Sequence, residues 1–292
     1  MRVRKAVFPA AGWGTRFLPV TKAQPKEMLP LVDKPIIQYG VEEAVAAGIE
    51  QVIIVTSTHK GAIEDHFDLN HELEHFLEEK GEIEKLRQVR SITDLAQIAY
   101  VRQKEQLGLG HAVLMAKDLI GHEPFAVILP DDVVVADRPC IGQLIHAYQQ
   151  THGSVVATME VPNEETKRYG IIAGDPVEGN LNHGRLRRVT KLVEKPEPKK
   201  APSNLAIIGR YVLTPKIFDK LEQTARGAGG EIQLTDAIEA LMEEQGVYGY
   251  EFEGTRYDAG TTMGWLKASV EIALQRPDLE KEFRRYLVDL EL

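Results

Sequence analysis

Short apolar runs alternate with helical patterns along the first half of this chain. The runs fall at Lys5–Phe8, Gln51–Thr56, Ile98–Arg102 and Phe125–Leu129. The helical patterns that accompany them are Ile36–Ala47, His111–Leu119 and Ile141–Gln150. Strands that alternate with helices fold as βαβ units, and near-continuous apolar strands are buried on both faces of a sheet. The sequence therefore predicts an α/β fold, with a Rossmann-like mixed, mostly parallel sheet flanked by helices.

The second half of the chain follows a different pattern. Four strand candidates have only turns and loops between them: Ser154–Glu160, Ile171–Gly174, Leu186–Val193 and Ala206–Val212. Strands joined this closely predict a partly antiparallel extension of the sheet. The helical patterns that follow are Leu234–Gln245, Thr262–Gln275 and Asp278–Leu290. Because no long linker separates the two halves, residues 1–292 are expected to form a single domain.

Composition excludes several classes of protein. The 292 residues are 43% hydrophobic, which is too apolar for a disordered chain. With 35 Lys and Arg against 44 Asp and Glu, the net charge is −9, so broad binding to nucleic acid is not expected. No apolar run reaches the roughly 18 residues that span a membrane. Cys140 is the one cysteine and cannot form an internal disulfide, which fits a cytoplasmic protein.

A glycine-containing loop, Pro9–Arg16, follows the first predicted strand. Ligands bind beyond the carboxyl ends of parallel strands, and successive N–H groups in such a loop can bind an anion. Gly12 and Gly14 let the backbone approach a ligand, and Arg16 matches phosphate oxygens. The third glycine of the dinucleotide-binding fingerprint is replaced by Phe17, which weakens a dehydrogenase interpretation. A tight strand-to-loop turn would explain the glycine pair equally well.

Two further features are expected at the same edge of the sheet. Lys22 and Lys26 lie in a loop bracketed by prolines, which could direct Lys26 toward the same phosphates, although exposed lysines are usually only solvated. Asp131 and Asp132 directly follow the apolar run that ends at Leu129. A carboxylate there is well placed to hold Mg²⁺ against phosphate oxygens. An Asx turn or helix cap is the alternative, and one of the two aspartates is expected to be only structural.

These features together resemble the nucleotidyltransferases that make nucleotide sugars, and among them the bacterial UTP–glucose-1-phosphate uridylyltransferases. Gly12–Tyr39 matches the signature of that family over nearly its whole length. Other matching segments are Gly108–Ala112, Val127–Asp131, Val193–Pro196, Pro202–Tyr211 and Glu231–Ile238. The resemblance spans roughly residues 5 to 275. It implies a nucleotide-binding part at about 1–150 and a sugar-binding and C-terminal part at about 151–292.

The resemblance assigns roles to individual residues. Those implied to contact the uracil and the triphosphate are Ala10, Ala11, Gly12, Gly14, Thr15, Arg16, Lys26, Gln103 and Gly108. Those implied to contact the glucose are Gly170, Glu194 and Gly209, while Lys195 would bind the sugar phosphate. Asp131 would ligate Mg²⁺, and Asp258 matches a second aspartate on the metal side.

The implied reaction transfers the uridylyl group of UTP to glucose 1-phosphate and yields UDP-glucose and pyrophosphate. The attacking phosphate is already ionised near pH 7, so we expect neither a general base nor a covalent intermediate. Mg²⁺, Arg16, Lys26 and Lys195 would supply positive charge. The family also implies a homodimer or homotetramer. Two alternatives stay open: a thymidylyltransferase that uses dTTP, and a non-catalytic homologue that binds a nucleotide sugar and regulates a partner.

One motif points to different chemistry. His71-Glu72-Leu73-Glu74-His75 satisfies the His-Glu-x-x-His pattern of zinc proteases. The surrounding stretch Glu72–Gln88 is rich in Glu, Lys and Leu, which predicts a charged surface helix or helical hairpin. Because no third zinc ligand follows at the usual spacing, we interpret the motif as a solvated helix face.

Overall fold

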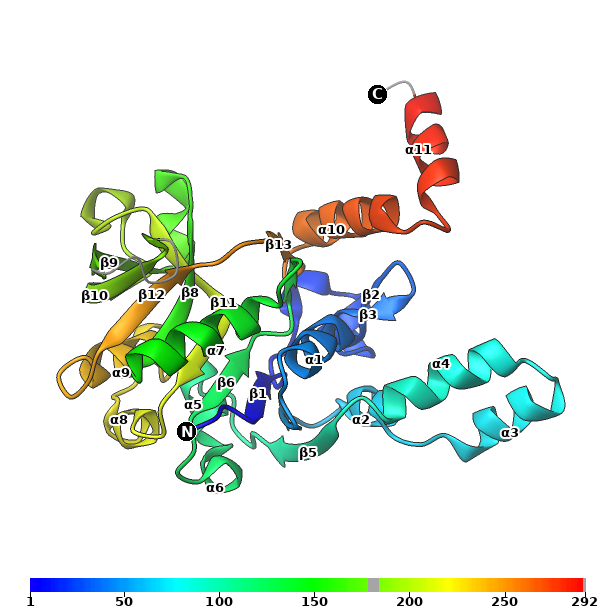
Figure 1. Cartoon of the computed structure of the whole chain (residues 1–292), viewed down its shortest axis with the longest axis horizontal. Helices are drawn as coiled ribbons and strands as arrows, with labels where there is room; N and C mark the ends of the chain where they lie inside the picture. The colour runs from blue at the N-terminus through cyan, green and yellow to red at the C-terminus, as the bar shows by residue number, and fades with distance from the viewer. Residues whose placement is uncertain (178–183, 291–292) are drawn as a thin grey trace.

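Within residues 1–177 and 184–290, which the computed structural model describes, the central sheet has nine strands in the order β5-β4-β1-β6-β11-β8-β12-β10-β9 (Figure 1). The first four of these are parallel to one another, and their bounds are Gln97–Arg102 (β5), Gln51–Thr56 (β4), Lys5–Pro9 (β1) and Phe125–Ile128 (β6). They coincide with the four apolar runs of the sequence. The predicted parallel part of the fold is confirmed.

The other side of the sheet is mainly antiparallel. Its strands are Leu205–Leu213 (β11), Ser154–Glu160 (β8), Val247–Glu251 (β12), Leu186–Glu194 (β10) and Gly170–Pro176 (β9). Strand β11 runs antiparallel to both β6 and β8, and β10 runs antiparallel to both β12 and β9. In the described part of this side, only β12 and β8 pair in parallel. The mixed sheet is therefore as predicted, with its parallel strands concentrated in the N-terminal half.

Alternate residues of the strands belong to two separate hydrophobic clusters. In β1, Ala6 and Phe8 pack with Ile37 and Leu144 on one face, whereas Val7 packs with Phe218 on the other. Successive side chains of a strand point to opposite faces, so the sheet is buried on both sides by helices. The helices are Ile36–Ala46 (α1), Gly61–Phe67 (α2), Leu109–Leu114 (α5), Lys117–Ile120 (α6), Cys140–Thr151 (α7), Ile217–Gln223 (α8) and Leu234–Leu241 (α9).

A small second sheet was not anticipated from the sequence. Asp132–Val135 (β7) pairs antiparallel with Thr255–Asp258 (β13), and Asp258 lies opposite Asp132 in the register. The pairing places β13, from the C-terminal part of the chain, beside the strand that follows β6. Another short pair, Pro30–Leu31 (β2) and Lys34–Pro35 (β3), precedes α1.

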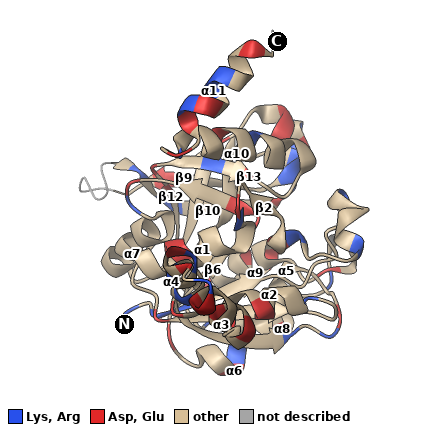
Figure 2. Cartoon of the chain, turned by 90° about the vertical axis from the view of Figure 1, so that its right-hand side faces the viewer, with Lys and Arg blue, Asp and Glu red and all other residues tan. Residues whose placement is uncertain are grey.

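Two helical segments extend away from the sheet (Figure 1). His71–Glu79 (α3) and Ile83–Thr93 (α4) form the predicted hairpin. Thr262–Gln275 (α10) and Glu280–Asp289 (α11) lie at the C-terminal end. Figure 2 shows acidic and basic residues along α3, α4 and α11. No helix in the described part of the chain is both long enough and apolar enough to cross a membrane.

Candidate active site

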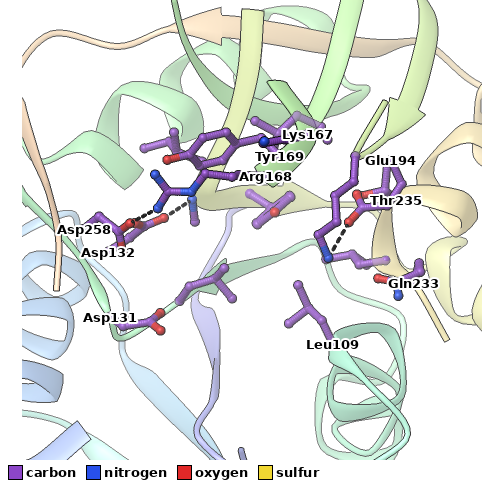
Figure 3. Close-up of a pocket in the computed structure, with 18 of the residues that line it drawn as sticks. Leu109, Asp131, Asp132, Lys167, Arg168, Tyr169, Glu194, Gln233, Thr235 and Asp258 are labelled. Atoms are coloured by element: carbon purple, nitrogen blue, oxygen red, sulfur yellow. Dashed lines mark hydrogen bonds and ion pairs between the residues drawn. The ribbon is translucent and has the colours of Figure 1, made fainter. Parts of the chain in front are cut away.

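A cavity of about 460 Å³ opens where the loop after β6 meets β11 and the facing ends of β9 and β10 (Figure 3). Several of the residues selected from the sequence line it: Arg16, Asp131, Gly170, Glu194, Lys195, Gly209 and Asp258. They come from both halves of the chain. The structure therefore brings these seven residues together around one cavity, and their phosphate-binding and sugar-binding roles stay predictions.

The loop after β1 borders this region and is held by its own hydrogen bonds. The Ala10 N–H donates to Val55 O at 2.8 Å, so this amide is already engaged. The carbonyl of Ala11 accepts from Ser57 Oγ at 2.9 Å and from Gln106 Nε2 at 2.8 Å. Gly12 is exposed, and a side chain there would meet no atom within 4 Å. The backbone around Gly12 is thus open to a ligand.

The next part of the loop turns back on itself. Gly14 has a φ of 67° and precedes the short 3₁₀ turn Thr15–Phe17. A Cβ on Gly14 would lie only 3.1 Å from Lys26 Cβ, so the glycine lets the loop pack directly on this lysine. Gly14 thus places the turn that contains Arg16 directly beside Lys26.

Lys26 and Asp131 form an ion pair, with Nζ and Oδ2 separated by 2.5 Å. Burial alone would lower the pKa of Lys26, but the carboxylates of Asp131 and Glu27 outweigh it and raise that pKa. Burial would likewise raise the pKa of Asp131, and the Lys26 ammonium reverses this and lowers it. Both groups are therefore charged at neutral pH.

Behind this pair, Glu27 is buried and contacts Lys60 Nζ at 2.7 Å. Burial raises the pKa of Glu27 despite the two neighbouring lysines. Glu27 thus adds a second carboxylate next to Lys26 and holds the 3₁₀ turn Lys26–Met28 against the start of α2.

Asp131 and Asp258 flank one small space. A Cβ placed on Gly260 would lie 2.8 Å from Asp131 Oδ2 and 3.2 Å from Asp258 Oδ1. Arg168 Nη2 lies 2.8 Å from Asp258 Oδ2, and Arg16 Nη1 donates to Gly260 O at 3.4 Å. Two carboxylates surrounded by cations form a site that suits a divalent cation carrying an anionic ligand.

The donor set fits a hard metal ion. Among residues 1–177 and 184–290, no three His, Cys, Asp or Glu side chains gather in a way that could hold a metal. Asp131 and Asp258 alone would leave most coordination positions to water and phosphate, which is how Mg²⁺ is usually bound.

The His-Glu-x-x-His motif lies away from this cavity. His71 and His75 lie on α3, and His75 Nε2 contacts Glu79 Oε1 at 3.5 Å on the exposed face of that helix.

The neighbouring Asp132 has a structural role. Its Oδ2 accepts the Gly209 N–H at 2.7 Å, and its Oδ1 accepts from Arg256 Nε at 2.8 Å. A Cβ on Gly209 would lie 2.6 Å from Asp132 Oδ2. Gly209 therefore lines the cavity as a glycine because Asp132 occupies the adjacent space. The expectation that one of the two aspartates is structural agrees with this geometry.

The sugar-side wall is built around the end of β10. Lys195 has a φ of 44°, unusual for a residue with a side chain, and its N–H donates to Tyr169 O at 3.0 Å. Lys195 Nζ lies 3.1 Å from Glu194 Oε1. A Cβ on Gly170 would lie 3.3 Å from Glu194 Oε2. The left-handed backbone thus turns Lys195 toward Glu194 and the cavity.

Gln103 and Gly108 are not among the residues that line the cavity, although Gly108 directly precedes Leu109, which does line it. Gln103 is buried, and its Nε2 contacts Gly108 O at 3.2 Å and His111 Nδ1 at 2.9 Å. Gly108 precedes α5 with a φ of 94°.

The single helix predicted over His111–Leu119 is instead two short helices, α5 and α6, because the chain turns between Leu114 and Lys117.

Gly108→Ala is expected to reduce the free energy of unfolding by about 2 to 3 kcal/mol, because positive φ and close packing both oppose a side chain. The new Cβ would lie 2.6 Å from Glu231 Cβ and 3.1 Å from Ile232 O. Urea denaturation measures the loss. Gly81→Ala is the matched control, since Gly81 has a φ of 69° with nothing within 4 Å and should cost only about 1 kcal/mol. Equal losses for the two variants would contradict the packing argument.

Several cavity residues were not identified from the sequence. They are Lys167, Arg168, Tyr169, Tyr211, Thr235 and Arg256. A weak signal existed, because Arg168 and Tyr169 directly precede Gly170 and Arg256 lies two residues before Asp258. Thr235 lies within the matching segment Glu231–Ile238. These residues reach the cavity only because the fold brings together segments that lie far apart in the sequence.

Comparison with known proteins places these features in a family. The family model described as nucleotidyl transferase matches residues 5–275. The chain belongs to the nucleotidyl transferase family. A UTP–glucose-1-phosphate uridylyltransferase of Staphylococcus epidermidis is 55% identical over 291 residues, which cover 100% of this chain and 99% of the relative. The resemblance stated from the sequence is confirmed, and this nucleotidyl transferase is an enzyme.

Solved structures agree with the family and with the fold. A UDP-glucose pyrophosphorylase complexed with UDP-glucose is 44% identical, with a TM-score of 0.85 over 94% of this chain and 100% of that one. A UTP-bound UGPase from Acinetobacter baumannii is 42% identical, with a TM-score of 0.90 over 99% of both chains. The predicted α/β fold of this nucleotidyl transferase is therefore confirmed.

Proposed function

We propose that this nucleotidyl transferase transfers the uridylyl group of UTP to α-D-glucose 1-phosphate, giving UDP-glucose and pyrophosphate. The observation that carries the proposal is the cavity, which the cationic side chains of Arg16, Arg168 and Lys195 line together with the carboxylates of Asp131 and Asp258. Two polyanionic substrates need such a cation-lined space to approach each other. The relatives that bind UTP or UDP-glucose support this choice of substrates.

Each side of the cavity has a role in this proposal. The loop from Ala10 to Arg16, together with Lys26, binds the triphosphate, and Gln103 and Gly108 contact the uracil. Lys195 holds the sugar phosphate, while Gly170, Glu194 and Gly209 contact the glucose. An oxygen of the sugar phosphate then attacks the α-phosphorus in line and displaces pyrophosphate. That oxygen is already ionised at neutral pH, so no general base and no covalent intermediate are needed.

Mg²⁺ belongs to the proposal as the cofactor, with Asp131 and Asp258 as the residues that would hold it. When bound, it would neutralise charge on the phosphate oxygens. The protein's own contribution is to keep Asp131 ionised, which Lys26 achieves by lowering the pKa of that carboxyl. Arg16 and Lys195 approach the same space from opposite halves of the chain and orient the two anions.

The proposal extends to the oligomeric state and the cellular location of the enzyme. None of the residues of α11 is buried within the described chain, and Tyr286 and Val288 are exposed. This surface supports a homodimer or homotetramer. A single domain and a cytoplasmic location complete the proposal, the latter supported by the lone buried cysteine, Cys140.

A direct assay of pyrophosphate release tests the proposed function. With glucose 1-phosphate and Mg²⁺, we expect UTP to give a kcat/KM at least tenfold above that for dTTP. A preference for dTTP would make the enzyme a thymidylyltransferase. Binding of UDP-glucose with no pyrophosphate release from either nucleotide would favour the non-catalytic regulatory homologue.

A further inference from the structure

Asp132, Arg256 and Tyr169 form a connected network across the cavity. Arg256 contacts Asp132 Oδ1 through both Nε and Nη2, and the Nε distance is 2.8 Å. Arg256 Nη1 donates to Tyr169 Oη at 3.1 Å. The guanidinium also lies over the Tyr169 ring, 5.3 Å from its centroid. One arginine thus joins the loop after β6 to the segment that precedes β9.

The network continues through the backbone on both sides. Tyr169 O accepts the Lys195 N–H at 3.0 Å, which holds Lys195 in its left-handed conformation. On the other side, Asp132 is adjacent to Asp131 and accepts the Gly209 N–H at 2.7 Å. An unbroken series of bonds therefore leads from the proposed metal ligand to the proposed sugar-phosphate ligand.

The ion pair between Arg256 and Asp132 is well suited to fix the distance between β13 and β7. The side chains of Arg256 and Asp132 are only 10% and 9% exposed. A guanidinium that binds a carboxylate through two nitrogens is defined in direction as well as in distance. Burial of both charges also makes the cost of separating them high. The pair behaves as a rigid connector between β13 and β7.

We propose that Asp132, Arg256 and Tyr169 are positioning residues that hold Lys195 and the sugar-phosphate wall in register with Asp131. The inference rests on the proposed function, because it uses the roles assigned there to Asp131 and Lys195. None of the three residues needs to touch the reacting atoms. In-line transfer depends on close alignment of two bound anions, and this network links their two binding walls beside the Arg168–Asp258 ion pair.

Tyr169→Phe is the sharpest test, because it removes one hydroxyl and keeps the ring against Arg256. The expected result is a three- to tenfold increase in KM for glucose 1-phosphate, with the KM for UTP unchanged within twofold. Arg256→Lys keeps the charge but cannot bridge Asp132 and Tyr169 together, so we expect a larger increase of about 30-fold in the same KM. Tyr39→Phe and Arg276→Lys are matched controls, since both residues lie outside the cavity lining.

A double variant tests whether Tyr169 and Arg256 act together on the KM for glucose 1-phosphate. If Tyr169 acts through Arg256, Tyr169→Phe should add less than twofold to the loss already caused by Arg256→Lys. Independent, multiplicative losses would overturn the proposal, as would equal increases in KM for both substrates. Thermal unfolding of each variant identifies any that simply misfold, and Tyr169→Phe is expected to unfold within 2 °C of wild type.

The test of this network can fail or succeed independently of the proposed function. If the wild-type enzyme prefers another nucleotide or another sugar phosphate, the proposed substrates are wrong. The same KM comparison is then made with the pair that the enzyme does use. A selective effect on the sugar phosphate would still support the network, and no selective effect would refute it.

Discussion

Asp131→Asn is expected to reduce kcat/KM by at least about 10³-fold, equivalent to roughly 4 kcal/mol of transition-state stabilisation. The amide keeps the shape of the side chain but removes the charge that faces Lys26 and the space beside Gly260. A neutral amide is a poor ligand for Mg²⁺ compared with a carboxylate. Mg²⁺ titration of the activity should therefore shift to much higher concentrations, and an unchanged titration curve would refute the role of Asp131.

Asp132→Asn is the control for this result, because the two aspartates are adjacent but differently engaged. Asp132 faces Arg256 in a buried ion pair, so loss of its charge leaves a buried guanidinium without a counter-ion and should lower Tm by several degrees. The Asp131 side chain is 27% exposed, and Lys26 keeps Glu27 as a neighbouring carboxylate, so Asp131→Asn should lower Tm less than Asp132→Asn does. A larger loss of Tm in Asp131→Asn would show that its effect on activity is structural.

The parallel half of the sheet was predictable because burial on both faces leaves a simple sequence pattern. Gln51–Thr56 and Phe125–Ile128 contain almost nothing but apolar side chains, and both are strands. The loop after β1 and the aspartate after β6 could be assigned to one edge of the sheet by the same rule. Local patterns of this kind determine where the site lies.

The rest of the site depends on pairings that no local pattern contains. Arg256 and Asp132 are 124 residues apart in the sequence, and Arg256 and Tyr169 are 87 apart. Strands β7 and β13 have only four residues each, too few for an alternation to be recognised. The sequence therefore indicated Asp258 as a family match but could not show that β13 carries it to Asp132.

Lys195→Ala is expected to lower kcat/KM for glucose 1-phosphate by about 10³-fold, since a single well-placed donor to a developing charge contributes about 3 to 4 kcal/mol. The fold should persist, because the Lys195 side chain is 52% exposed and contacts Glu194 rather than the core. Equilibrium binding of UTP should change less than threefold, because the triphosphate is assigned to Arg16, Lys26 and the loop after β1 rather than to Lys195. Steady-state kinetics and calorimetric titration with UTP measure the two effects.

Lys199→Ala tests whether the effect comes from position or merely from lost charge. Lys199 lies in the 3₁₀ turn Pro198–Lys200, in the loop that begins just after Lys195, and is outside the cavity lining. Lys199→Ala removes one positive charge close to Lys195 in the sequence, and it should leave kcat/KM within twofold of wild type. If Lys195→Ala also kept near wild-type kcat/KM, Lys195 would not hold the sugar phosphate. Comparable losses in both variants would instead indicate a long-range attraction of anions, which salt would screen over about 10 Å at 0.1 M.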